Sequence, residues 1–117
     1  SEYVQALDIS SGNVDIDLSV AQTFTLTVDE AVTSFTLLNP PSGATAFSIL
    51  ITQDSTGYSV GIDTFKDSGG TAIPVYWPGG GVLPVVTTVA SKSDIYSFKT
   101  FDGGSSLYGV VGGQNFA

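Results

Sequence analysis

The sequence predicts an all-β protein, built as a single antiparallel β-sandwich of about eight short strands. Several runs alternate apolar and polar residues, which is the pattern of a strand with one buried face. Val, Thr, Ile, Phe and Tyr are abundant, and 14 Gly and 5 Pro punctuate these runs. The 117 residues form one domain, 1–117, which is long enough to bury a core of its own. A jelly roll would fit the same pattern, and an antiparallel barrel is the alternative.

Residues 14–63 supply five of these strands. Residues 14–20 and 23–28 alternate strictly, and because only two residues separate them we expect a hairpin. Residues 34–39 form a third strand, which two prolines end. Residues 46–52 are apolar on both faces, which predicts a central strand buried on both sides. A turn at 53–57 would pair this strand with a short one at 59–63.

The second half is less regular. We expect a long irregular loop with short extended pieces over 64–90, and another short strand at 85–89. Residues 94–101 and 106–111 form a second hairpin around a Gly-rich turn. Residues 112–117 form a tail that could order only against something else.

The composition excludes several classes of function. His and Cys are absent, so the chain offers no imidazole or thiolate for zinc or haem, no Ser-His-Asp triad and no disulfide. The net charge of −8 opposes binding to nucleic acid or to an anionic membrane. No apolar run approaches the roughly 18 residues that a membrane helix needs. We therefore expect that the protein has no cofactor and binds neither nucleic acid nor a membrane. If an initiator Met was removed before Ser1, we also expect the chain to be a complete small gene product.

The carboxylates are the remaining candidates for chemistry. Asp15 and Asp17 leave the same strand face, where they could bind a cation, although a solvated face is the simpler interpretation. Other aspartates lie at strand ends, where this residue caps turns, and no spacing selects a pair for glycoside hydrolysis. The glycines at 79–81 lack the Lys-Ser/Thr of a phosphate loop. We predict that the protein is not an enzyme.

Aromatic and apolar residues in irregular segments are the candidates for interfaces. Tyr76 and Trp77, the latter the only Trp, lie between glycines. Trp77 either plugs one end of the sandwich, contacts another protein or stacks on a sugar ring. Residues 1–7, with Tyr3 and Val4, form either an ordinary first strand or an arm that adds a strand to a neighbouring sheet. Phe116 in the tail completes this set.

The second half also carries a series of short motifs in a characteristic order. The chain reads "ITQDSTGYSV", then "FKDSGGTAIPVYWPGGG", then "SDIYSFKTFDGGSSLYGV". Over residues 47–111 it resembles a small β domain of tailed-bacteriophage virion proteins, found in tail-fibre-like and other structural proteins of cyanophages and other marine phages. The matching positions are Gln53, Asp54, Thr56, Gly57, Lys66, Trp77, Pro78, Gly79, Gly80, Asp94, Phe98, Asp102, Gly103 and Tyr108. The chain departs from the family pattern at Ile62, where a Trp is usual, and in the placing of the glycines around Trp77.

The resemblance implies a structural protein of the virion surface that forms oligomers and has no catalytic activity. A small domain without a shaft or receptor tip of its own suits a capsid decoration (cement) protein. Such a protein would be a homotrimer that binds the major capsid protein and stabilises the shell through several contacts at once. The alternative is a tail or head fibre module that binds a host surface glycan or another virion protein.

Overall fold

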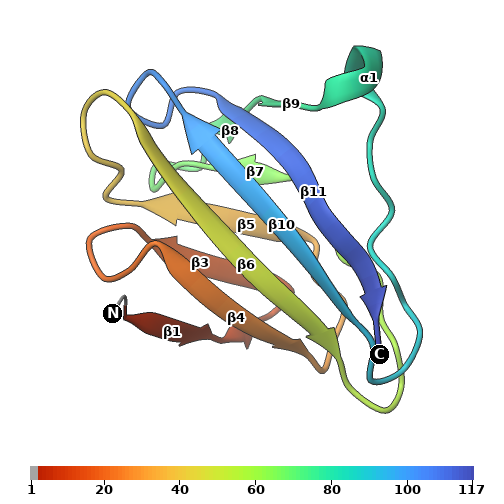
Figure 1. Cartoon of the computed structure of the whole chain (residues 1–117). Helices are drawn as coiled ribbons and strands as arrows, with labels where there is room; N and C mark the ends of the chain where they lie inside the picture. The colour runs from red at the N-terminus through yellow and green to blue at the C-terminus, as the bar shows by residue number, and fades with distance from the viewer. Residues whose placement is uncertain (1–2) are drawn as a thin grey trace.

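The computed structural model describes residues 3–117 as two packed β-sheets (Figure 1). The six-stranded sheet has the order β1 (Val4–Leu7), β4 (Thr23–Val28), β6 (Thr45–Gln53), β10 (Ser93–Thr100), β11 (Leu107–Phe116) and β9 (Val75–Tyr76). The five-stranded sheet has the order β2 (Ile9–Ser10), β3 (Asn13–Asp17), β5 (Ser34–Leu38), β7 (Phe65–Lys66) and β8 (Ala72–Ile73). A single helical turn, α1 (Pro78–Gly81), follows β9. The prediction of an all-β fold is confirmed.

The chain winds as a flattened coil through its first half. It passes from β1 to β3 in the other sheet, returns as β4, and continues through β5 to β6 and β7. Each return to a sheet completes one turn of the coil, so β4 runs parallel to β1 and to β6, and β5 runs parallel to β3 and to β7. Both sheets are therefore mixed, and the prediction of a single antiparallel sandwich or jelly roll is wrong. Residues 3–117 also contain eleven strands rather than about eight, because several are only two residues long.

The expected first hairpin is the clearest correction. Residues 13–17 and 23–28 are strands, but they lie in opposite sheets and do not pair. The connection between them is an arch across the end of the core, in which Leu18 and Ala21 are each only 4% exposed. Strict alternation is the same for a strand in a hairpin and for a strand in an arch, because in both cases one face meets the core.

Two expectations for the following segment are also wrong. The strand at residues 45–53 has alternating burial and only one face in the core, with Leu50 37% exposed on the other. Residues 59–63 do not pair with it, and instead Val60 forms an isolated bridge with Val32. The apolar residues Ala46 and Leu50 explain the error, because they lie on the outward face of the sheet, which no second layer of the described chain covers.

The region 64–90 is a loop with short extended pieces, as expected, but one of these pieces is misplaced in the prediction. It carries β7, β8, β9 and α1, whereas residues 82–90 contain no strand, so the strand expected at 85–89 is absent. The second hairpin is confirmed, because β10 and β11 pair in antiparallel fashion around the turn at 101–106. The segment expected as a tail is ordered against β10: β11 continues to Phe116, which pairs with Ser93 beyond an irregularity in the register.

A cluster of phenylalanine rings joins the two sheets at the centre of the core. Phe65 of the five-stranded sheet lies with its ring centroid 5.0 Å from that of Phe35 and 5.0 Å from that of Phe98 in the six-stranded sheet. Phe47 stacks on Phe98 at 5.2 Å. Aromatic pairs at these separations add roughly 0.5–1.5 kcal/mol each to the free energy gained from burial. Phe98, one of the motif residues, therefore has a packing role.

Candidate functional site

The candidate site lies where β9 and β11 meet at one edge of the six-stranded sheet. Tyr76 and Tyr108 are register partners on these parallel strands, each 51% exposed, and their ring centroids are 5.4 Å apart. Phe101, 60% exposed, meets Tyr108 edge to face at 5.7 Å. The Lys99 ammonium lies 4.9 Å from the centre of the Phe101 ring. Three exposed aromatic rings are thus continuous on one surface.

Trp77 turns away from this surface and into the core. It is 9% exposed, and its ring meets Phe98 edge to face at 5.8 Å. The indole also lies directly over Gly109: a Cβ at that position would come within 2.6 Å of Trp77 Cζ3. Of the interpretations open for Trp77, its position in the structure is that of a core residue which closes the edge of the sandwich. Its Nε1–H is buried and has no hydrogen-bond partner among the described residues.

A hollow of about 220 Å³ opens beside these rings. It is lined by Tyr76, Trp77, Pro78, Tyr108, Gly109 and Val110. No carboxylate takes part in this lining, and the tyrosines are its only residues with a side-chain oxygen. The hollow can therefore hold an uncharged group with an apolar surface.

The outward face of the six-stranded sheet adjoins the hollow and has an unusual composition. The alternation of burial and the strand register place small, hydroxylated or aliphatic side chains on it. They are Val4, Ala6, Thr23, Thr25, Thr27, Ala46, Ser48, Leu50, Thr52, Ser93, Ile95, Ser97, Lys99, Tyr108 and Val110. We call these residues the neutral face; among these described positions Lys99 is the only charged side chain. The acidic residues within 3–117, in a chain of net charge −8, lie elsewhere.

The opposite outward face, on the five-stranded sheet, carries the aspartates that the sequence placed on one strand face. Asp15 is exposed and accepts a hydrogen bond from the Asn13 amide at 2.9 Å. Asn39 and Ser19 donate to Asp17, which holds the pKa of that carboxyl below its ordinary value. Within residues 3–117, no three acidic side chains gather as metal ligands would.

Two of the motif residues anchor the irregular loop 82–90 to the core. The Gln53 side chain, 2% exposed, donates to the carbonyls of Tyr58 and Thr87 and accepts from the Tyr58 N–H, all at 2.8–2.9 Å. Asp94, 1% exposed, accepts from the Thr87 and Asn115 N–H groups and from the Tyr96 hydroxyl at 2.7–2.8 Å. These two side chains replace the backbone ladder that a strand at 85–89 would have supplied.

Asp94 and Tyr96 have perturbed pKa values because of this arrangement. Burial by itself would raise the pKa of Asp94, but the N–H groups of Thr87 and Asn115 and the Tyr96 hydroxyl hold it below 3.8. Burial and the neighbouring Asp94 carboxylate raise the pKa of Tyr96. Both groups are therefore fixed in their ordinary charge states, and neither is poised to exchange a proton near neutral pH.

The other motif residues form turns. Asp54 accepts from the Thr56 and Gly57 N–H groups, and Gly57 has a φ of +85°. A Cβ at Gly57 would collide with the Thr88 carbonyl oxygen, so the turn at 54–57 packs directly on the loop 82–90.

Asp102 and Gly103 belong to the turn of the second hairpin. Asp102 accepts from the hydroxyl and the N–H of Ser106, which lowers its pKa. Gly103 takes a φ of +70° and donates its N–H to the Gly43 carbonyl at 2.9 Å. The turn is thereby tied to the connection between β5 and β6.

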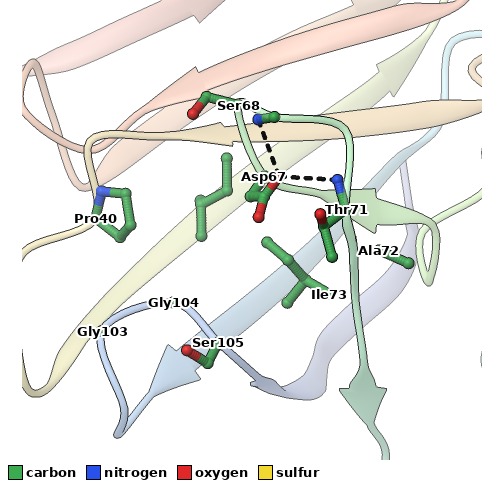
Figure 2. A pocket seen from close by; sticks show the side chains of 11 residues that line it. Pro40, Asp67, Ser68, Thr71, Ala72, Ile73, Gly103, Gly104 and Ser105 are labelled. Carbon is green, nitrogen blue, oxygen red and sulfur yellow. Dashed lines mark hydrogen bonds between the residues drawn. The ribbon is translucent and has the colours of Figure 1, made fainter.

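A second hollow, of about 400 Å³, lies between this turn and the connection from β7 to β8 (Figure 2). One oxygen of Asp67 accepts from the N–H groups of Gly69 and Thr71 at 2.9 and 2.8 Å. The walls are turn backbone and small side chains, and Leu37 and Ile73 complete the lining. Asp67 is the only acidic residue that lines it, so the hollow lacks the carboxylate pair that glycoside hydrolysis requires.

The terminal interface candidates lie apart from the aromatic site. Tyr3 and Val4 are 63% and 50% exposed at the outer edge of β1, while Ser1 and Glu2 of the expected arm lie outside the described residues. Phe116 is 47% exposed at the end of β11, and its ring covers Gly113. Strand β1 pairs with β4, as an ordinary first strand would.

The sequence identified Tyr76 as an interface candidate. It did not identify Phe101 as part of the same surface, and it identified Tyr108 only as a motif residue. The signal was available in the second hairpin, because its register sets Tyr108 opposite Lys99 on the outward face. The parallel pairing of β9 with β11, which brings Tyr76 to Tyr108, has no local sequence signal.

Comparisons with protein-family models, with curated proteins and with solved structures gave no match for this chain. Among the helices of residues 3–117, none has the length and apolar character to cross a membrane.

Proposed function

We propose that this chain is a non-enzymatic structural protein of a tailed-phage virion, a capsid decoration protein that acts as an oligomer. In this proposal it docks on other virion proteins through the neutral face of the six-stranded sheet. The observation that supports docking is the absence of carboxylates from this face in a chain of net charge −8. The virion setting comes from the motif resemblance over residues 47–111.

The chemistry of the neutral face favours loss of water on contact. Burying an unpaired carboxylate costs several kcal/mol, whereas this face carries none. Its hydroxyls already pair across strands, with Ser48 to Ser97 and Thr52 to Ser93 each at 2.8 Å. Exposed aliphatic side chains such as Leu50 gain roughly 25 cal/mol per Å² of apolar area that a partner covers.

The rigidity of the fold supports a role in bracing a shell. The coiled strands tie segments distant in sequence together, because β4 pairs with β1 and with β6, and β5 pairs with β3 and with β7. A rigid domain loses little conformational freedom on docking. A homotrimer would make several such contacts at once, which raises the effective concentration of each one.

The experiment mixes the purified protein with undecorated capsids and follows co-sedimentation and lattice position by electron microscopy. We expect stoichiometric binding at regular lattice points for the natural chain. Leu50→Asp and Leu50→Lys should both abolish it, because either charge would be buried without a partner. Val20→Asp, at an aliphatic residue that is 44% exposed away from the neutral face, is the matched control. Failure of the natural chain to bind capsids, or full binding by both Leu50 variants, would reject the proposal.

A second candidate function is a fibre module that binds a host glycan. The exposed rings of Tyr76 and Tyr108 favour it. Recovery of the protein on tail or fibre preparations, with none on capsids, would select this function.

A further inference from the structure

We propose that the hollow between β9 and β11 binds one sugar ring of a neutral saccharide. This inference rests on the second candidate function, the glycan-binding module, and names its ligand class. The hollow shares Tyr108 and Val110 with the neutral face, whereas Leu50, the residue that tests docking, does not line it. Tyr76, Trp77, Pro78, Tyr108, Gly109 and Val110 line it, and its volume is about 220 Å³.

The two tyrosines form a wall suited to stacking. Their rings are 5.4 Å apart and inclined by 38°, so together they present a shallow, nearly continuous aromatic surface. The face of an aromatic ring carries negative electrostatic potential. The axial C–H groups on one side of a pyranose are weakly positive and apolar, and they pack against such a face. The phenol hydroxyls can then exchange hydrogen bonds with the sugar hydroxyls.

Trp77 and Gly109 pack against each other in the lining of the hollow. The lack of a side chain at Gly109 lets the indole pack directly against β11, and Tyr76 and Pro78 are its neighbours in the chain. Phe101 supports Tyr108 from the side by an edge-to-face contact at 5.7 Å. The wall is therefore held in place before a ligand arrives, which reduces the entropy lost on binding.

Charge selects the class of saccharide. The net charge of −8 repels polyanionic glycans, and no carboxylate in the lining could neutralise a cationic one. Neutral sugars meet neither obstacle. The Ser97 hydroxyl lies on the same outward face beside Val110, where it can meet the next ring of a longer saccharide.

The size of the hollow limits the contact to one ring. Enclosed pockets for drug-sized ligands usually measure about 300–1,000 Å³, and this hollow is smaller and open. Each site is thus expected to bind weakly, and firm attachment would need several copies of the chain on one particle. Proline-rich peptides also pack in aromatic grooves. They commonly lack the hydroxyl groups of a sugar ring, which could form hydrogen bonds with the hydroxyls of Tyr76, Tyr108 and Ser97.

The single Trp makes the test direct. Because Trp77 lines the hollow, its fluorescence should change on titration with neutral hexasaccharides of glucose, mannose or N-acetylglucosamine. An array of bacterial surface glycans, read with the same protein, extends the panel to neutral and acidic glycans. We expect binding to at least one neutral glycan and to no acidic one.

Variants locate the binding. Tyr76→Ala and Tyr108→Ala should each weaken it about tenfold or more, whereas Tyr76→Phe, which keeps the ring, should retain most of it. Tyr3→Ala removes an exposed tyrosine at the far edge of the sheet and is the control. Leu50→Asp should leave glycan binding intact, which separates this site from the docking contact. Thermal melts of every variant exclude unfolding as the cause of a loss.

Three results would overturn the inference. One is the absence of any neutral glycan that binds, across both the titrations and the array. Another is binding that survives in the Tyr76→Ala, Tyr108→Ala double variant. The third is selective binding of a proline-rich peptide, or self-association of the protein, that depends on these two tyrosines while no glycan binds.

Discussion

Asp94 provides the most informative test of how this fold is held together. Its buried carboxylate joins three segments: β10, the loop 82–90 through Thr87, and the end of β11 through Asn115. Asp94→Asn keeps the shape of the side chain but replaces one oxygen with an NH₂ group and removes the charge. The substitution therefore measures what the carboxylate contributes.

The expected loss follows from the four donors around the carboxylate. Thr87 N–H, the Tyr96 hydroxyl and, at 3.4 Å, the Gln114 amide meet Oδ2, and Asn115 N–H meets Oδ1. The asparagine will keep its oxygen toward the larger group, so its NH₂ faces the Asn115 N–H and leaves that donor without an acceptor. An unsatisfied buried donor costs about 1–3 kcal/mol, and the bonds that remain weaken when the charge is lost. We expect a destabilisation of about 3 kcal/mol, or a fall in Tm on the order of 10 °C.

The pH dependence gives an independent check. The folded-state pKa of Asp94 lies below its ordinary value of 3.8. The carboxylate therefore stabilises the fold above the unfolded-state pKa, and this contribution is lost as the pH falls through the folded-state pKa. In Asp94→Asn that part of the acid transition disappears, so the difference in stability between the two proteins should shrink below pH 3.8.

The assay is urea unfolding followed by Trp77 fluorescence at several pH values, with Asp29→Asn as the control. Asp29 is exposed, so the control removes the same charge without a buried network. Equal stability of the Asp94 and Asp29 variants at pH 7, or an unchanged gap between Asp94→Asn and the natural chain at low pH, would refute the reasoning.

Two further substitutions test the contacts that close the sandwich. Gly109→Ala places a Cβ within 2.6 Å of the Trp77 ring, so we expect the free energy of unfolding to fall by about 1–3 kcal/mol and the Trp emission to shift to the red. Gly69→Ala, in an open turn, should have little effect on the stability or on the emission. Gln53→Leu removes the side-chain hydrogen bonds to Tyr58 and Thr87, so hydrogen exchange at the Tyr58 amide should accelerate by roughly tenfold or more. Gln22→Leu, at an exposed position, should leave that exchange rate unchanged, and the same Tyr58 exchange rate in both variants would contradict the anchoring role of Gln53.

The candidate site was only partly visible in the sequence. Tyr76 stands out because it lies in an irregular, Gly-rich segment. Its partners Tyr108 and Phe101 look like ordinary members of a hairpin until the pairing of β9 with β11 brings the rings together. Trp77 has the same local setting as Tyr76, yet it faces the core, because successive residues of an extended segment point to opposite sides.

The sequence by itself determined that the protein is all-β, where most of the long strands lie, that the β10–β11 hairpin forms, and that histidine or cysteine chemistry is absent. These properties depend on composition, on alternation and on local turns. Only the tertiary structure decided which strands pair. Residues 14–18 and 23–28 have the same alternation in a hairpin as in an arch, and the arch is formed because Leu18 and Ala21 find burial at the end of the core. That choice makes the sheets mixed and gathers the outward neutral residues of five strands on one face, which is a non-local property that no single segment of the chain carries.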